Sequence, residues 1–240
     1  MSTNKYIGDE IYYPEGDGKP MADNTLQYEW IVTIKEGLEI ERPNDFVAAD
    51  LFWYPVKGNP HIHYAPDVMV AIGRPKGHRP SYKQWEEENI APQVVFEILS
   101  PCNTIPEMIR KFNFYNTYGV QEYYIFDPQQ KEFFVYCRHS ESLAAVDFVG
   151  GWVSPLLGIR FQFADQELKI FHTNGEVFLS FPELRSLLAQ ERQEKQIALA
   201  NIQEAEAKAQ EAEAKAEQER QEKEKLKEKL RQLGIDPDSI

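Results

Sequence analysis

Two acidic residues lie at or inside apolar segments rich in β-branched residues, where an unpaired charge is costly. Asp67 opens one such run, and about 30 residues later Glu97 lies within the run VVFEILS. Lys111 follows in a segment with helical periodicity. If the two runs form neighbouring strands, Asp67 and Glu97 can offer oxygens to one hard divalent cation while Lys111 approaches from the helix. The spacing therefore predicts a site for metal-assisted catalysis.

Purely structural roles also fit these three residues. Asp67 could cap a turn, Lys111 could be a solvated helix residue, and Glu97 could be paired with Lys111 alone. His61 and His63 could share one strand face, but no third candidate ligand lies near them, which favours a structural or surface role over a metal site. A phosphate loop, a nucleophile elbow and paired zinc-ligand motifs are absent from the sequence, which removes several common enzyme classes.

The segment RPKGHRPSYKQWEEEN concentrates positive charge between two apolar runs. Glycine and two prolines interrupt it, which predicts a surface loop or a short helix. Its four basic residues are Arg74, Lys76, Arg79 and Lys83. One interpretation is a solvated loop. The other is a substrate-binding loop that contacts phosphates, because the basic residues of the domain are otherwise scattered.

Apolar periodicity predicts the ordered elements of the chain. Asp23 or Asn24 can cap a helix that runs to Gly37, and a second helix is expected from Thr104 to Tyr118. Runs rich in β-branched and aromatic residues predict strands. The expected strands are Phe46 to Val56, Asp67 to Ile72, Gln93 to Leu99, Val120 to Phe126, Phe133 to Cys137, and short segments around Trp152, Phe161 to Phe163, Leu168 to Phe171 and Val177 to Phe181. Strands interleaved with helices predict an α/β or α+β domain.

The composition changes abruptly after Pro182, since no Gly or Pro occurs again until Gly234. One set of positions from 184 to 233 is spaced alternately by four and three residues without a break. These positions hold mainly Ala, Leu and Ile, with four charged residues. This repeat predicts a charged coiled-coil helix that associates weakly, whereas a solitary helix held by i,i+4 pairs is the alternative. The chain thus divides into a flexible arm (1–22), a domain (23–182), a coiled-coil helix (183–233) and a tail (234–240).

The charge balance argues against easy binding of nucleic acid. The net charge is -13, of which the portion 1–182 carries -10, and such a surface repels a phosphate backbone on average. Only two cysteines occur, in no metal-ligand spacing, and the first residues do not have the pattern of a signal peptide. No apolar run approaches the length that crosses a bilayer. We therefore expect a cytoplasmic protein without a membrane partner.

Two long stretches of the domain resemble a known family. They are APDVMVAIGRPKGHRPSYKQWEEENIAPQVVFEILSPCNT and EMIRKFNFYNTYGVQEYYIFDP. The chain resembles the Uma-two-type proteins, a group of restriction-endonuclease-like proteins within the PD-(D/E)xK nuclease superfamily, from roughly Asn24 to Leu184. The resemblance implies a restriction-endonuclease-like fold, a mixed sheet flanked by helices, and many relatives also carry a helical C-terminal tail.

The resemblance also implies roles for individual residues. Asp67 and Glu97 would be ligands of Mg²⁺ or Mn²⁺, and the carbonyl of Ile98 a third. The superfamily pattern has a lysine two residues after the glutamate, where this chain has Leu99, and Lys111 on the next helix matches the lysine that is usual in the family. Supporting positions in the same stretch are Glu107, Tyr115 and Glu122.

These residues predict a metal-dependent endonuclease that hydrolyses phosphodiester bonds, in which Lys111 orients the attacking water or stabilises the oxyanion. Two alternatives remain. The first is a binding protein on a nuclease scaffold, which assembles partners or forms a homo-oligomer through its coiled coil. The second is a structural oligomerisation factor, against which the retained Asp67, Glu97 and Lys111 argue.

Overall fold

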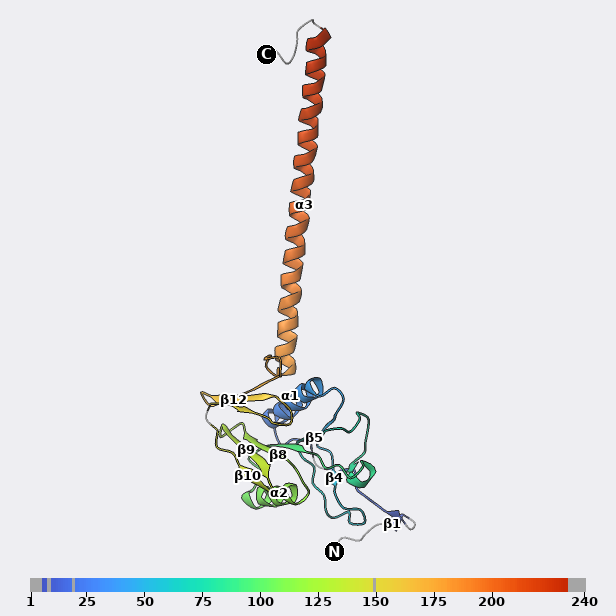
Figure 1. Cartoon of the computed structure of the whole chain (residues 1–240), viewed down its shortest axis with the longest axis vertical. Helices are drawn as coiled ribbons and strands as arrows, with labels where there is room; N and C mark the ends of the chain where they lie inside the picture. Colours follow the sequence, from blue (N-terminus) through green and yellow to red (C-terminus); the bar gives the residue numbers. More distant parts are fainter. Residues whose placement is uncertain (1–5, 8–9, 19, 149, 233–240) are drawn as a thin grey trace. The chain divides into compact units, whose positions relative to one another are not determined.

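The computed structural model describes the chain apart from residues 1–5, 8–9, 19, 149 and 233–240. The chain divides into two compact units, Met1–Phe181 and Pro182–Ile240 (Figure 1). The predicted tail over 234–240 lies outside the described residues, as does part of the predicted arm over 1–22.

A six-stranded mixed sheet forms the centre of the first unit, in the order β10-β9-β8-β7-β5-β3. The central pair, β7 and β8, is parallel, and all other neighbouring pairs are antiparallel. The strands are β3 (Phe46–Ala49), β5 (Val68–Ala71), β7 (Val94–Ile98), β8 (Glu122–Asp127), β9 (Glu132–His139) and β10 (Ser142–Ala145). The predicted mixed sheet flanked by helices is confirmed.

Helix α1 (Thr25–Glu41) covers one face of this sheet. The side chain of Asn24 caps it by accepting a hydrogen bond of 2.9 Å from the backbone N–H of Gln27. The predicted end at Gly37 is wrong, because the helix continues to Glu41. Gly37 is buried, and a Cβ there would overlap the ring of Phe178. The glycine therefore permits close packing inside the helix rather than ending it.

A small antiparallel sheet packs on the same side as α1 (Figure 1). Its strands are β11 (Trp152–Val153), β12 (Arg160–Ala164) and β13 (Glu167–Phe171), in the order β11-β12-β13. The expected strand from Val177 to Phe181 is wrong. Val177 makes only an isolated bridge to Phe171, and Phe181 already begins helix α3.

Helix α2 (Ile105–Thr117) covers the opposite face. The side chain of Thr104 caps it, and Pro106 stands in its first turn, where its missing N–H costs nothing. The parallel pair β4 (Trp53–Tyr54) and β6 (Tyr82–Lys83) lies on this side, followed by the 3₁₀ turn η1 (Gln84–Glu86). Trp53 is fully buried and stacks on Tyr115 of α2 with 6.4 Å between ring centroids. Burial of such a side chain stabilises the fold by roughly 1.5–3 kcal/mol, so it fixes α2 against the sheet.

The described part of the N-terminal arm begins with the strands β1 (Tyr6–Ile7) and β2 (Glu10–Ile11), which pair antiparallel. The ring of Tyr13 then packs against Tyr54 and Trp85, with centroid distances of 5.1 and 5.0 Å. The Tyr54 hydroxyl donates a hydrogen bond of 2.5 Å to the carbonyl of Pro14. These contacts attach the arm to the rest of the first unit.

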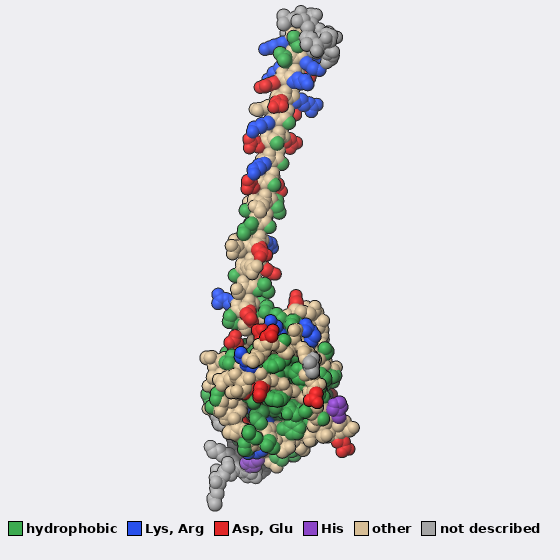
Figure 2. All heavy atoms as spheres, turned by 90° about the vertical axis from the view of Figure 1, so that its left-hand side faces the viewer, with side chains coloured by type: hydrophobic (Ala, Val, Ile, Leu, Met, Phe, Trp, Pro, Cys, Tyr) green, Lys and Arg blue, Asp and Glu red, His purple; other side chains and the backbone are tan. Residues whose placement is uncertain are grey.

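The described part of the second unit is a single helix, α3 (Phe181–Gln232), which begins at the last residue of the first unit. Acidic and basic side chains alternate along it (Figure 2), and ion pairs of 2.6 Å join Lys208 to Glu204 and Lys215 to Glu211. Its association as a coiled coil stays a prediction, and position 233 of the expected leucine seam lies outside the described residues. Within the described ranges, none of the helices has both the length and the hydrophobicity to cross a membrane.

Candidate active site

The pairing of β5 with β7 places Asp67 directly opposite Glu97. Val68 faces Phe96 and Met69 faces Val95 in this antiparallel register. The residue before Val68 is Asp67 and the residue after Phe96 is Glu97, so extending the register by one residue places these two opposite each other. Opposed residues point to the same face of a sheet, with Cβ atoms about 4.5–5.5 Å apart. This face is the one that α2 covers, because Met69 and Val95 belong to the same core cluster as Tyr115.

Helix α2 supplies two partners for the Glu97 carboxylate, which is only 1% exposed. The ammonium of Lys111 lies 2.6 Å from Oε2, and the hydroxyl of Tyr115 donates a hydrogen bond of 2.5 Å to Oε1. The two side chains reach the same carboxylate because residues four apart share one face of a helix. The sequence prediction for Tyr115 rested on resemblance alone, whereas Lys111 was also predicted from its spacing, and the structure brings both residues to Glu97.

The carboxylate of Asp67 is oriented by the backbone of β7. Its Oδ2 accepts a hydrogen bond of 2.7 Å from the N–H of Ile98, whereas Oδ1 has no donor among the described residues. Burial and the neighbouring Glu97 hold the pKa of Asp67 well above its usual range, although Lys111 and the Ile98 N–H oppose this shift. Asp67 is thus a crowded carboxylate that a further positive charge would stabilise.

Lys111 keeps its charge despite its burial. Desolvation lowers the pKa of Lys111, but the carboxylates of Glu97 and Asp67 outweigh it and raise the pKa above its ordinary value. Burial, followed by the charge of Glu97, raises the pKa of the Tyr115 hydroxyl well above its ordinary value. The tyrosine therefore remains a hydrogen-bond donor, and Lys111 remains a cation.

Sequence reasoning missed Gln27 of α1, which holds the carbonyl of Ile98. The Gln27 amide donates a hydrogen bond of 2.8 Å to this carbonyl, while its own carbonyl oxygen accepts one of 2.8 Å from the N–H of Asp23. The side chain is only 5% exposed. Nothing in the local sequence distinguishes this glutamine, because its role depends on α1 packing beside β7.

A pocket of ≈ 430 Å³ opens beside Asp67 and Lys111. Four further carboxylates, Asp17, Asp23, Asp50 and Glu107, line it. Burial and the charge of Asp17 raise the pKa of Asp50, which Lys111 partly opposes. Sequence reasoning also missed Asp50, although its place directly after β3, a neighbour of β5, is a usable signal. The pocket therefore carries a marked excess of negative charge.

The structure separates the predicted phosphate-binding loop from this pocket. None of the four basic residues of the loop is among the described residues that line it. Arg74 and Arg79 both pair with Glu87, at 3.0 and 2.5 Å, Lys76 donates a hydrogen bond to the carbonyl of Glu39, and Lys83 lies 3.7 Å from Glu86. Acidic side chains thus pair with Arg74, Arg79 and Lys83 of the loop, and its role in phosphate binding stays a prediction.

The structure separates Glu107 and Glu122, for which the sequence predicted supporting roles. Glu107 lies in the first turn of α2, lines the pocket and acts electrostatically on Lys111. Glu122 lies on the opposite face of the sheet, where it accepts hydrogen bonds from Tyr124, Ser154 and the N–H of Leu156. Alternation along β8 explains this placement, and the contacts of Glu122 are those of a structural residue.

The chemistry of the donor set fits a hard divalent cation. Asp67, Glu97 and the Ile98 carbonyl offer oxygens of the type that Mg²⁺ prefers, and burial together with the charge of Glu97 raises the pKa of Asp67. No group of three or more His, Cys, Asp or Glu residues that could hold a metal occurs in the described part of the chain. A carbonyl or water would have to complete the coordination of a cation held by Asp67 and Glu97.

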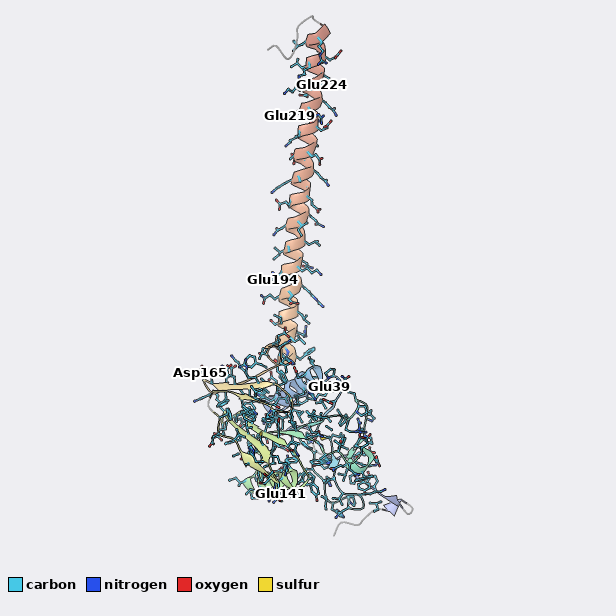
Figure 3. All side chains as sticks on the ribbon, viewed as in Figure 1. Glu39, Glu141, Asp165, Glu194, Glu219 and Glu224 are labelled. Carbon is cyan, nitrogen blue, oxygen red and sulfur yellow. The ribbon has the colours of Figure 1, made fainter. Side chains whose placement is uncertain are left out.

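Acidic side chains also lie on the outer surface of the first unit. Glu39, Glu141 and Asp165 project from it (Figure 3), in keeping with the net charge of -13. Any approach of a polyanion to the pocket therefore depends on local features of the site rather than on the average field of the protein.

Comparisons with known proteins give one family. The Uma2 family model, described as "Putative restriction endonuclease", matches residues 9–168. Among solved structures, the chain is similar to a protein from Anabaena variabilis ATCC 29413 that is described as a "putative nuclease belonging to DUF820". The two are 21% identical with a TM-score of 0.41, over 58% of this chain and 77% of that chain. No curated protein matches this chain.

Proposed function

The chain belongs to the Uma2 family of nuclease-like proteins, and from this premise we propose that it is a divalent-metal-dependent endonuclease that hydrolyses phosphodiester bonds of nucleic acid. The observation that carries the proposal is the pairing of Asp67 with Glu97 on one face of the sheet, with Lys111 between Glu97 and the pocket. One ammonium offsets only one of the two carboxylate charges, so a further cation would stabilise both carboxylates in their ionised form.

The residues of the site have separate roles in this proposal. Mg²⁺ or Mn²⁺, held by Asp67, Glu97 and the Ile98 carbonyl, would lower the pKa of a bound water and neutralise charge on the phosphate. Lys111 lines the pocket with a fixed positive charge, which stabilises negative charge as it develops on the phosphate oxygens. Tyr115 fixes the orientation of Glu97, and Gln27 fixes the Ile98 carbonyl.

A titration with Mg²⁺ and Mn²⁺, followed by calorimetry, tests the proposal together with cleavage assays on DNA and RNA. The wild type should bind the cation and cleave, and Asp67→Asn should lose both properties. Glu141→Gln is the matched control, because Glu141 is an exposed carboxylate outside the pocket. Equal cleavage by the wild type and Asp67→Asn would show contamination by another nuclease, and the proposal would then fail.

A specific observation favours a second function, that of a binding protein on a nuclease scaffold. Both oxygens of Glu97 already have partners, so the pair with Lys111 is stable without a metal. In this case the charged helix α3 would act by association with itself or with a partner helix. Cys102 and Cys137 are both free thiols, which supports the expected cytoplasmic compartment for either function. Absence of any cation binding would favour this second function.

A further inference from the structure

The pocket beside Asp67 and Lys111 has the dimensions of a small-molecule site. Its volume of ≈ 430 Å³ falls near the lower end of the range for pockets that enclose one small ligand, about 300–1,000 Å³. The described residues 20–23 of the arm and Gln27 of α1 form one side, and residues after β3 and β4 form another. A single nucleotide unit is of this scale, whereas a duplex would have to remain outside the pocket.

Three aromatic side chains contribute to the lining of the pocket, and we call them its aromatic wall. They are Phe52, His63 and Tyr64. The ring of His63 packs on Phe52 with 4.6 Å between centroids, and Tyr64 packs edge-on against Phe114 at 5.0 Å. These contacts hold the rings in place before any ligand binds. Preformed aromatic surfaces bind nucleobases by stacking, which is tolerant of sequence because every base has a π-face.

His63 belongs to this wall as a neutral ring. Its Nδ1 lies 2.9 Å from the carbonyl of Pro60, which fixes the ring orientation. Burial lowers the pKa of His63, although the Pro60 carbonyl and Asp17 act in the opposite direction. Near neutral pH the ring therefore acts as an aromatic surface rather than as a cation for phosphate.

The charges around the pocket disfavour a duplex more than a single strand. Lys111 is the one Lys or Arg among the described residues that line it, and it faces the acidic residues Asp17, Asp23, Asp50 and Glu107. Duplex DNA has one negative charge per about 1.7 Å of axis and needs many basic contacts for tight binding. A single strand has a lower charge density, and its bases can be inserted without the cost of unpairing.

We propose that the substrate of this site is a single-stranded nucleic acid, with one base against the wall formed by Phe52, His63 and Tyr64 and the adjoining phosphate beside Lys111. The inference rests on the proposed nuclease function, which it narrows to a substrate class. Stacking of a base on the aromatic wall supplies affinity for nucleic acid that the acidic pocket cannot supply through phosphate contacts.

The test compares one labelled oligonucleotide sequence in three forms: single-stranded DNA, single-stranded RNA and blunt duplex DNA. Binding to the full-length wild type is measured by fluorescence anisotropy in EDTA and in Ca²⁺, and cleavage is measured with Mg²⁺ or Mn²⁺. At least one single-stranded form should bind and be cleaved about tenfold or more in preference to the duplex. Equal or better use of the duplex would overturn the inference while leaving the nuclease proposal intact.

Variants of the aromatic wall make the test specific. Tyr64→Ala should weaken binding of the single strand by roughly 5- to 150-fold, the range for loss of one stacking contact, and Tyr64→Phe should restore it. Tyr28→Ala is the matched control, because Tyr28 is a 51% exposed aromatic residue outside the pocket. If Tyr64→Ala does not fold, Tyr64→Leu keeps apolar bulk without a π-face and should show the same loss.

The remaining outcomes separate this inference from the proposed function. Binding of single strands through Tyr64 without cleavage would support single-stranded nucleic acid as the ligand of the pocket and overturn the nuclease activity. Binding that is unchanged in both Tyr64→Leu and Tyr64→Phe would overturn stacking on the aromatic wall. Failure of all three forms to bind or to be cleaved would overturn both proposals.

Discussion

Lys111→Met removes one charge from the buried pair while keeping an unbranched apolar side chain. Glu97 is 1% exposed and Lys111 is 8% exposed, and their charged atoms lie 2.6 Å apart. Removal of one partner from a buried ion pair typically costs about 3–5 kcal/mol, because the other charge remains without compensation. We therefore expect Lys111→Met to lose stability in this range, which for a protein of this size lowers Tm by roughly 6–20 °C.

Chemical denaturation followed by tryptophan fluorescence measures this loss. All four tryptophans, Trp30, Trp53, Trp85 and Trp152, lie in the first unit, so the signal reports on that unit and not on α3. The double variant Glu97→Gln/Lys111→Met removes both charges and should recover much of the loss, since the energies of contacting residues are not additive.

Lys169→Met is the matched control for Lys111→Met. Lys169 pairs with Glu167 at 3.3 Å in the same unit, but the two side chains are 51% and 65% exposed. Exposed pairs contribute about 0–1 kcal/mol, so this variant should be close to the wild type. The assignment of a buried ion pair would be refuted if Lys111→Met lost no more stability than Lys169→Met, or if the double variant were no more stable than the single one.

Three further predictions follow from the same contacts. Because the pKa of Asp67 is raised in the folded state, this carboxyl costs no stability below its unfolded pKa of about 4, and the cost grows as the pH rises from there toward the folded pKa. Asp67→Asn should therefore stabilise the protein at pH 7, and the gain should shrink in denaturation curves recorded toward pH 4; a gain independent of pH would contradict this. Glu87→Gln should free Arg79 from its carboxylate partner and leave Arg74 paired with Glu88 at 2.7 Å, which should make binding of nucleic acid tighter and more salt-dependent by anisotropy; unchanged binding would show that the loop takes no part. Deletion of 183–240 should lower the mass measured by light scattering without unfolding the first unit, and an unchanged oligomeric state would exclude α3 as the contact.

Asp67 and Glu97 could be predicted as a candidate pair because Asp67 opens one apolar run of strand length and Glu97 lies within another. The sequence could not specify which strands are neighbours, and the opposition of the two carboxylates depends on the β5–β7 register. Lys111 and Tyr115 stand four residues apart, so their common helix face was predictable once α2 was recognised. The pair of Lys111 with Glu97 was one of the alternatives that the sequence left open, whereas the contact of Tyr115 with Glu97 was not predictable, because it requires α2 to pack across β7.

Two sequence predictions, a supporting role for Glu122 and a phosphate-binding role for the loop arginines, differ from the structure. The first difference is explained by the alternation of side chains along β8, and the second by ion pairing within the loop. Glu122 is in phase with Tyr124 and Phe126 along β8, and these belong to the core on the face away from the site. The period of two in a strand could have separated Glu122 from the site. The neutralisation of Arg74 and Arg79 by Glu87 was not predictable in the same way, because the loop must fold back before these charges meet.

The position of the lysine has a structural consequence for the proposed chemistry. Leu99 stands two residues after Glu97, where the superfamily pattern has a lysine, and it lines a separate apolar pocket with residues of α2 and β9. Lys111 reaches the Glu97 carboxylate from α2 instead, and it also lines the acidic pocket. The positive charge of a lysine can therefore reach the Glu97 carboxylate either from position 99, just after β7, or from α2. The difference is that the ammonium of Lys111 is held by Glu97 Oε2 and depends on α2, so displacement of this helix would remove the charge from the site. The activity should accordingly depend on the packing of α2 as well as on the carboxylates.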